Sequence, residues 1–496
     1  MSPLPAALKP WEPIQPFPGL SVRFLKESRC LPVRQEDGRV LLAMADPGDL
    51  ATRRTLEVVL AAPVEPVQIP EEAILEAIEA VYLPGSAMAR LVDGLEQEDY
   101  EPQHEETAEI GHLRDMAREA PIIQLVNLLI SRAIEIGASD IHLEPFENLF
   151  RVRYRKDGVL FDAESPPKAL EPAVLSRLKI MARMDIAERR LPQDGRFRLK
   201  FQGRDIDFRV STLPNLFGES MVIRILDRER VILDLEGLGF PADILAEFDR
   251  LIHKPYGMIL VTGPTGSGKT TTLYAALERI NSVEKKIITV EDPVEYRMAG
   301  VIQMQVKPDI GLTFARGLRH IVRQDPDVIL VGEIRDRETA EIAIHAALTG
   351  HLVFSTLHTN DAPGAVTRLL EMGIEDYLLS SALLGVLAQR LVRLICPQCK
   401  VPAPPGEGVA WAEGATVYRG RGCEACAHTG YQGRTGIYEL LVMNDALRQL
   451  ILRRADAVTL RQAAQEAGMR SLAADGWAKV KAGLTTPQEV LRVTHE

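Results

Sequence analysis

The sequence predicts an α/β protein whose C-terminal half is a parallel sheet covered by helices. Two observations carry this prediction. From about residue 235 the chain repeats a pattern of apolar strand, loop and helix, which is typical of a parallel α/β core. Between a helix that Gly137 can end and about Asp227, short runs alternate apolar and polar side chains, which indicates a half-buried antiparallel sheet. The chain therefore combines units of different architecture.

Composition is that of an ordinary globular protein. Apolar residues make up 46% and charged residues 26% of 496 positions, which allows about two to four domains with cores of their own. The 58 basic and 69 acidic side chains leave a net charge of −11, which argues against a protein that mainly grips nucleic-acid phosphates. We find no secretory signal and no apolar run near about 18 residues. We therefore expect a cytoplasmic protein that meets membranes only through partners.

The first part of the chain predicts a small α/β domain without catalytic residues. Residues 40–45 indicate a strand, 46–49 a turn and 71–82 an amphipathic helix after Pro70. The stretch 96–109 holds seven acids and neither Lys nor Arg, and Pro102 interrupts it. Such a stretch cannot bury a core. We therefore interpret 96–118 as an acidic linker rather than as a solvated helical face.

The middle of the chain predicts a helix followed by strands. Pro121 suits the first turn of a helix, and Gly137 suits its end. Strand-like alternation follows at 150–154, 197–201 and 220–225.

A phosphate-binding loop is the strongest chemical signal in the chain. The apolar strand 258–262 leads into GPTGSGKT at 263–270, and a helix with an apolar face follows, which is the context that this motif requires. The glycines let backbone N–H groups cradle phosphate oxygens at a helix N-terminus. Lys269 would reach the β- and γ-phosphates of ATP, and the Thr270 hydroxyl would bind Mg²⁺. The predicted nucleotide-binding residues are Gly263, Pro264, Thr265, Gly266, Ser267, Gly268, Lys269, Thr270 and Thr271.

Two glutamates follow strands and therefore lie at the phosphate end of the predicted sheet. Glu333 follows the strand 328–331, and we predict that it belongs to the Mg²⁺ shell or activates water. Glu291 follows the strand 287–290 and is the second candidate for orienting or deprotonating the attacking water. Asp325 and Asp327 precede their strand, which puts Asp327 roughly 20 Å of extended chain away. The alternative for either glutamate is a surface carboxylate at a strand end.

Three histidines occur within fourteen residues, but their surroundings do not favour a metal site. His351 and His358 flank the strand-like run 352–355 without a cysteine or paired acid at ligand spacing. We predict that His358 senses the γ-phosphate or couples its presence to motion, and that His345 is structural.

Four of the five cysteines form two CxxC pairs, Cys396 with Cys399 and Cys423 with Cys426, separated by 23 residues. This pattern predicts a tetrahedral four-thiolate zinc site. The alternatives are disulfides or free thiols, which the expected cytosolic location disfavours. No neighbouring acid or open position indicates catalysis, so the predicted role is structural. Cys30 remains and is interpreted as a small buried apolar residue.

Several longer motifs carry a family resemblance. They are ASDIHLEP (138–145), LPQDGR (191–196), TVEDPVE (289–295), DPD through GEIRD (325–336) and TGH through TLHT (349–359). With the P-loop, they make the chain resemble the secretion ATPases of type II secretion systems and the assembly ATPases of type IV pili. The paired CxxC motifs match the secretion and pilus-extension members and are typically lacking in pilus-retraction relatives.

The resemblance implies a domain order and an assembly. It implies an N-terminal recruitment domain (1–95), a PAS-like α+β domain (119–235) and a RecA-like ATPase domain (236–496) with a zinc-binding loop (394–430). It implies a homohexamer that binds ATP between the two lobes, where Arg196 and Arg209, with Arg204 as a further candidate, reach the phosphates. The N-terminal domain would bind the cytoplasmic part of an inner-membrane secretion platform, which also includes a polytopic protein.

The resemblance therefore predicts a motor that hydrolyses ATP to drive pseudopilus assembly in type II secretion. Within the same family, the alternative is a type IV pilus extension motor. Two other classes stay open at this point. A RecA-like nucleic-acid translocase would need a basic channel, which the net acidity disfavours. A nucleotide-dependent scaffold without turnover is disfavoured because Lys269, Glu291 and Glu333 occur together.

Overall fold

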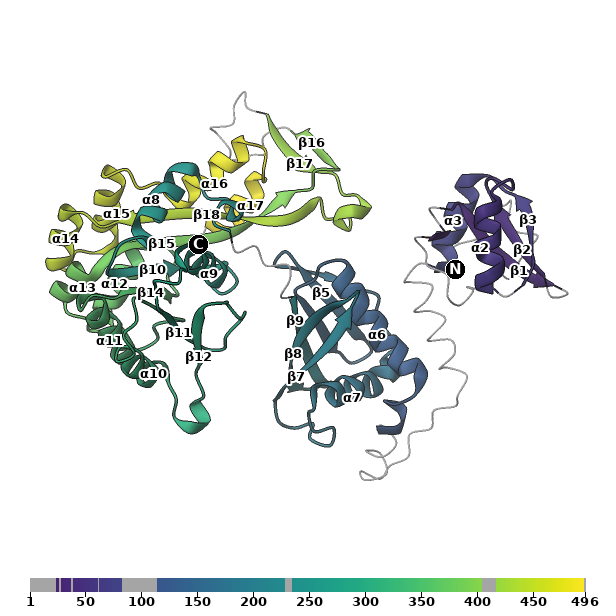
Figure 1. Ribbon diagram of the computed structural model, residues 1–496, viewed down its shortest axis with the longest axis horizontal. Coiled ribbons are helices and arrows are strands. Elements are labelled where there is room, and N and C mark those ends of the chain that lie inside the picture. The colour runs from purple at the N-terminus through teal and green to yellow at the C-terminus, as the bar shows by residue number, and fades with distance from the viewer. Residues whose placement is uncertain are drawn as a thin grey trace. The chain divides into compact units, whose positions relative to one another are not determined.

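The computed structural model describes residues 24–25, 28–36, 39–60, 62–82, 114–227, 234–403 and 416–494. The chain divides into two compact units, Met1–Asp227 and Arg228–Glu496, and each is described by itself (Figure 1). The predicted acidic stretch 96–109 lies outside the described residues. The domain limits expected from the sequence stay predictions.

The first unit begins with a small sheet of three strands. Strand β2 (Arg39–Met44) pairs antiparallel with β1 (Cys30–Glu36) and parallel with β3 (Val64–Gln68). Helices α2 (Leu50–Leu60) and α3 (Glu71–Tyr82) pack with the strands around Leu42, Leu56 and Ile78. The predicted strand 40–45 and helix 71–82 are present as β2 and α3. Cys30 lies in this core, and burial raises the pKa of its thiol to about 12.

The rest of the first unit is an antiparallel sheet of six strands with two helices on one face. The strand order is β6-β5-β4-β9-β8-β7. The sheet buries alternate side chains such as Ile206, Phe208 and Val210 beneath the helices and turns the others away from them. The bounds are α6 (Ala120–Glu135), β4 (Asp140–Pro145), β5 (Phe150–Lys156), β6 (Val159–Asp162), α7 (Glu171–Ala182), β7 (Gln193–Phe201), β8 (Arg204–Asn215) and β9 (Gly218–Asp227).

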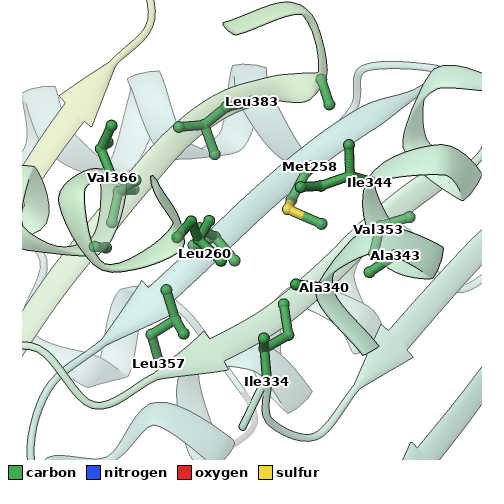
Figure 2. Packing of buried hydrophobic residues seen from close by; sticks show 14 of the residues in the cluster. Met258, Leu260, Ile334, Ala340, Ala343, Ile344, Val353, Leu357, Val366 and Leu383 are labelled. Carbon is green, nitrogen blue, oxygen red and sulfur yellow. The ribbon is translucent and has the colours of Figure 1, made fainter. Parts of the chain in front are cut away.

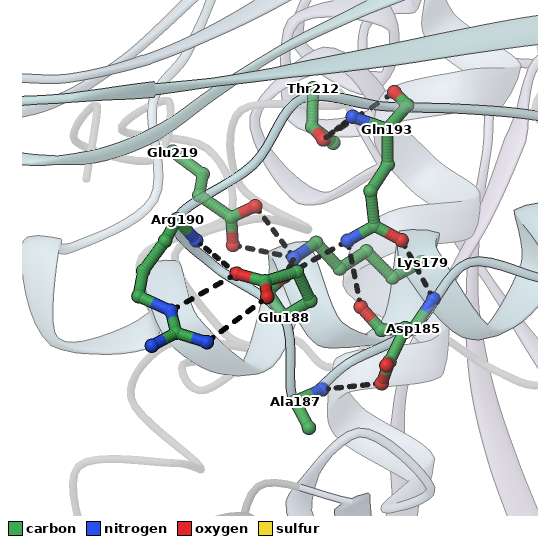
Figure 3. A network of polar contacts seen from close by, with 8 residues as sticks. All are labelled: Lys179, Asp185, Ala187, Glu188, Arg190, Gln193, Thr212 and Glu219. Atoms are coloured by element: carbon green, nitrogen blue, oxygen red, sulfur yellow. Dashed lines mark hydrogen bonds and ion pairs between the residues drawn. The ribbon is translucent and has the colours of Figure 1, made fainter.

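A polar network holds the segment between α7 and β7 (Figure 3). The buried Lys179 ammonium donates to Glu219 at 2.7 Å and to the Glu188 carbonyl at 2.8 Å. The Gln193 side chain bonds the backbone of Asp185 in both directions, at 2.8 and 2.9 Å. Gly195 follows, and a Cβ there would lie 2.5 Å from the Ala182 carbonyl oxygen. Close approach to α7 therefore requires this glycine, which explains part of the LPQDGR motif.

The second unit is built on a sheet of seven strands in the order β12-β11-β13-β14-β10-β15-β18 (Figure 1). All neighbours pair parallel except β15 and β18, which pair antiparallel. The predicted α/β core is confirmed. The strands are β10 (Gly257–Thr262), β11 (Ile287–Glu291), β12 (Val301–Gln305), β13 (Val328–Val331), β14 (Leu352–Leu357), β15 (Leu383–Ile395) and β18 (Tyr431–Val442), and a separate pair is formed by β16 (Lys400–Ala403) and β17 (Val417–Gly420).

Helices cover both faces of this sheet. Met258 and Leu260 of β10 point to one face, where Figure 2 shows Met258 beside Ile344, while Ile259 and Val261 pack on the other. Burial on both faces explains why strands such as β10 and β13 are continuous apolar runs. The helices are α8 (Ala242–Ile252), α9 (Lys269–Ile280), α10 (Phe314–Ile321), α11 (Arg337–Leu348), α12 (Ala362–Glu371), α13 (Asp376–Ala382), α14 (Asp445–Leu452), α15 (Ala457–Glu466), α16 (Leu472–Lys481) and α17 (Pro487–Thr494).

Among the residues that the structure describes, no helix has the length and apolar character needed to cross a bilayer.

Candidate active site and metal centre

The loop between β10 and α9 has the backbone that a phosphate cradle needs. Gly266 and Gly268 have φ values of 78° and 89°, in the left-handed region that glycine tolerates best. A Cβ on Gly263 would lie 2.5 Å from the Gln389 carbonyl oxygen, because β15 runs directly beneath the loop. Nothing lies within 4 Å of the position of a Cβ on Gly266, so this side of the loop is open. The loop therefore presents its backbone at the start of α9.

The polar side chains of this loop fit a phosphate ligand. Lys269 donates to the carbonyl oxygens of Gly263, at 2.7 Å, and Pro264, at 3.1 Å, which are acceptors that phosphate oxygens would replace. Burial lowers the pKa of Lys269 to about 8, against an opposing contribution from the charge of Glu333. The hydroxyl of Ser267 is buried without a partner in the structure, and Thr270 is exposed in the first turn of α9. The donor set therefore suits the phosphates and Mg²⁺ of a nucleotide.

Glu333 and His358 come together at the carboxyl ends of β13 and β14. The His358 Nε2 atom lies 3.4 Å from Glu333 Oε2, and Arg335 pairs with the other carboxylate oxygen. The Glu333 side chain is 17% exposed and that of His358 is 50% exposed, so both are open to a ligand. The Thr356 hydroxyl donates to the Gly332 carbonyl at 2.7 Å, which holds the two strand ends in register. Two residues singled out separately in the sequence thus form one cluster.

Glu291 ends β11 and is only 4% exposed. Thr289 Oγ1 donates to its Oε1 atom at 2.5 Å, Gln303 Nε2 donates to Oε1 at 3.3 Å, and the Tyr274 hydroxyl donates to Oε2. Burial raises the pKa of Glu291 above its usual value, and the three hydrogen bonds oppose that effect. The second predicted acid is therefore an inner carboxylate with organised donors, whereas Glu333 is an accessible one.

Other predicted residues lie at the opposite end of the sheet. Asp327 accepts the Lys286 N–H at 2.7 Å just before β13, and His351 bonds the Ala346 carbonyl at 2.9 Å just before β14. His345 is exposed on α11. Among the described residues, no three His, Cys, Asp or Glu side chains gather for a metal except four cysteines.

Gln389 of β15 is a site residue that sequence reasoning missed. It is 1% exposed, and its Nε2 atom donates to the Ser267 carbonyl of the phosphate loop at 2.6 Å. These two residues are 122 positions apart in the sequence. Only the pairing of β15 with β10 brings them together, so no local signal pointed to Gln389.

The predicted arginines lie side by side in the first unit. Arg196 of β7 is the cross-strand partner of Arg209 of β8, which in turn is opposite Arg224 of β9. Arg224 was missed by the sequence analysis, and its Nε atom donates to Asp140 at 3.1 Å. Arg204 lies at the start of β8. The phosphate loop belongs to the second unit, so contact between these arginines and phosphate stays a prediction.

The four predicted cysteines form one cluster. Their Sγ atoms all lie within 4.8 Å of one another, and Cys396–Cys423, Cys399–Cys426 and Cys423–Cys426 are 3.8, 3.9 and 3.7 Å apart. A disulfide needs a separation of about 2.05 Å, whereas a tetrahedral site with Zn–S bonds of about 2.3 Å has S–S edges of about 3.8 Å. The spacing therefore fits a four-thiolate metal site, and the cysteines are free of disulfides.

Backbone N–H groups and glycines lie close to the cysteine cluster. Burial opposes ionisation of Cys426, but the N–H groups of Cys423 and Gly430 point at its sulfur, and the pKa of this thiol is lowered to about 6. A Cβ on Gly420 would lie 2.0 Å from the Gly430 carbonyl oxygen. The predicted loop 394–430 includes residues 404–415, which lie outside the described residues.

The sheet topology and the phosphate loop define a P-loop ATPase, and comparison with known proteins gives its family. The family model described as "Type II/IV secretion system protein" matches residues 115–492, and the MshEN domain model matches residues 4–88. The chain belongs to the type II/IV secretion system ATPase family. It is 51% identical to type II secretion system protein E of Xanthomonas campestris pv. campestris, over 98% of this chain and 87% of that protein.

A pilus assembly ATPase and two ATPases of solved structure are also similar to this chain. The type IV pilus assembly ATPase PilB of Myxococcus xanthus is 48% identical over 93% of this chain and 83% of its own length. The crystal structure of the pilus retraction motor PilT with bound ADP has a TM-score of 0.52 and 30% identity, and the match covers 74% of this chain and 96% of that chain. The Legionella pneumophila ATPase DotB shares the fold. Its structure matches with a TM-score of 0.54 and 20% identity, and the match covers 74% of this chain and 94% of that chain.

Proposed function

We propose that this ATPase powers type II protein secretion by driving pseudopilus assembly through an inner-membrane platform. The observation that carries the proposal is that a phosphate loop with Lys269 and a Glu333–His358 pair at the sheet edge occur together in one chain. This chain is 51% identical to a type II secretion system protein E over 98% of its length. The similarity to PilB supports a pilus extension motor as the second candidate.

The proposed roles follow from the site geometry. The loop Gly263–Thr271 holds the ATP phosphates, and Thr270 and Glu333 hold or orient Mg²⁺ and its water shell. Bound Mg²⁺ neutralises phosphate charge. Glu291 accepts a proton from the attacking water, and His358 responds to the γ-phosphate. Arg196 and Arg209 complete the site when the two lobes close, and a guanidinium in this role contributes roughly 10³–10⁵ in rate.

The proposed assembly is a homohexamer on the cytoplasmic face of the inner membrane. The MshEN domain match supports an N-terminal module that binds the cytoplasmic part of a platform protein. The four cysteines hold a structural zinc, which the 3.7–3.9 Å sulfur spacing supports.

The proposed task predicts which partner stimulates turnover. We expect the steady-state ATPase rate of the full chain to rise with a cytoplasmic fragment of the platform protein encoded beside it, because docking would favour the closed and assembled ring. DNA should have no effect, and a Lys269→Ala variant should stay inactive with either addition. Stimulation by DNA alone would instead indicate a nucleic-acid translocase.

The partly buried Lys269 predicts proton uptake on nucleotide binding. At pH 8 about half of the free chains carry an uncharged Lys269, because burial lowers its pKa to about 8. Bound phosphates restore the charge and raise the pKa, so binding of Mg-ATP should take up about half a proton at pH 8 and almost none near pH 6.5. Calorimetry in two buffers of different ionisation enthalpy measures this uptake.

The matched control is Lys269→Arg, because a guanidinium stays charged at these pH values. This variant should show no proton uptake at either pH. Equal binding enthalpies in the two buffers at pH 8 for the unaltered chain would contradict the depressed pKa of Lys269.

A further inference from the structure

The carboxylate of Glu291 lies in an unusually complete set of neutral donors. Tyr274 is fully buried in α9, and its hydroxyl donates to Glu291 Oε2. Thr289 and Gln303 both donate to Oε1. The orientation of the Gln303 amide is set by its own partners, because its oxygen accepts the Met298 N–H at 2.9 Å and its nitrogen donates to the Tyr296 carbonyl at 2.8 Å.

This environment differs from that of two other buried acids of the same chain, which pair with cations. Glu219 pairs with Lys179, and Glu489 pairs with Arg393 at 2.6 Å and with Arg492 at 2.8 Å. Within the described residues, Glu291 has no cationic partner, and the nearest charge that affects it is the carboxylate of Glu295, which raises its pKa. An inner carboxylate without a counter-ion depends on hydrogen bonds to stay ionised.

The donor count distinguishes the two oxygens. An ionised carboxylate offers about two lone-pair sites on each oxygen. Thr289 and Gln303 occupy both sites on Oε1, whereas Tyr274 occupies one site on Oε2. Oε2 is therefore the atom that retains an acceptor site.

Tyr274 also links this carboxylate to the phosphate loop. It lies five residues after Lys269 on the same helix, which corresponds to roughly 7.5 Å along the helix axis. The Tyr274 ring packs edge-on against Tyr296, with ring centroids 5.8 Å apart, so the position of the phenol is fixed from two sides.

We propose that Tyr274 is a positioning residue for ATP hydrolysis: its hydroxyl holds the Glu291 carboxylate by a hydrogen bond and aims Oε2 as the proton acceptor at a set distance from the phosphate loop. This rests on the proposed role of Glu291 as the base. Water transfers a proton to Oε2 while its oxygen bonds to the γ-phosphorus, and the bond from that phosphorus to the β,γ-bridging oxygen breaks, which releases ADP. Tyr274 keeps its own proton throughout.

The test is the Tyr274→Phe variant of the full chain, assayed for Mg-ATP hydrolysis across pH. We expect kcat to fall about tenfold with KM within about twofold, and the acid limb of the kcat profile to move up by about one pH unit. The sign follows because loss of a hydrogen bond to the ionised form raises the pKa of Glu291. An unchanged kcat and acid limb would overturn the proposal.

The matched control is Tyr438→Phe. Tyr438 is equally buried, but its hydroxyl donates to the Leu238 carbonyl at 3.0 Å and, among the described residues, to no carboxylate. This variant should keep the acid limb of the unaltered chain, and an equal shift in both variants would overturn the specific role of Tyr274.

Two further measurements separate the possible failures. Glu291→Gln should abolish turnover. If it does and Tyr274→Phe behaves as the unaltered chain, only the proposed role of Tyr274 is wrong. Full turnover in Glu291→Gln would overturn the proposed roles of both residues. If Tyr274→Phe fails to fold, 3-fluorotyrosine incorporated into the full chain provides a stronger donor. It should move the acid limb to lower pH, and an unmoved limb would overturn the proposal.

Discussion

Replacing Glu333 with glutamine is expected to stop ATP turnover while ATP remains bound. The amide keeps the size of the side chain but removes the negative charge that Mg²⁺ or an attacking water requires. Proton transfer by a positioned group contributes about 10²–10⁴ in rate, so we expect kcat to fall by at least about 100-fold. The residues of the phosphate loop are unchanged, and at pH 6.5 the solution lies well below the pKa of Lys269, whose charge Glu333 supports, so the Kd of ATP at that pH should change by less than about threefold.

Single-turnover hydrolysis and equilibrium binding of a fluorescent ATP analogue measure the two quantities on the same preparation. The matched control is Glu341→Gln on α11. The exposed Glu341 carboxylate pairs with Arg337 at 2.7 Å and lies away from the phosphate loop. A surface pair of this kind contributes about 0–1 kcal/mol, so this variant should hydrolyse ATP normally. Turnover near that of the unaltered chain in Glu333→Gln would remove Glu333 from the mechanism.

Freshly purified, reduced protein is expected to contain about one zinc per chain, and Cys423→Ser is expected to lose it. The four sulfur atoms already lie near the edge lengths of a tetrahedral zinc site. Without the ion, ionised thiolates would repel one another at these distances. We expect the thermal midpoint to fall by about 10 °C, which corresponds to roughly 3 kcal/mol for a domain of this size.

The loss should spread beyond the cysteines, because the neighbouring strands β15 and β18 also hold the C-terminal helices. The Tyr431 hydroxyl lies 2.9 Å from Thr486 Oγ1, and Arg393 pairs with the buried Glu489. Metal analysis and calorimetry measure the two effects. The control is Cys30→Ser in the N-terminal sheet, which should keep one zinc per chain. Absence of metal from the unaltered protein would contradict the four-thiolate assignment.

The local chemistry of this protein could be predicted from the sequence. The phosphate loop, the CxxC pairs and the glutamates after β11 and β13 depend on spacing within a few residues. A residue that follows a parallel strand lies at the carboxyl end of the sheet, and a residue that precedes it lies at the other end. Glu333 and His358 were therefore expected at one edge, and the structure brings them within 3.4 Å. Asp327 was expected at the other end, where it bonds Lys286.

The tertiary structure alone decided which side chains surround these groups. Tyr274 and Gln303 reach Glu291 from α9 and β12, and Gln389 reaches the phosphate loop from a strand more than a hundred residues later. Arg224 joins Arg196 and Arg209 only through the register of three strands. Such contacts depend on sheet order and register, which arise from the packing of the whole core. Sequence spacing therefore determined the chemical groups of the site, and long-range pairing determined the environment of each.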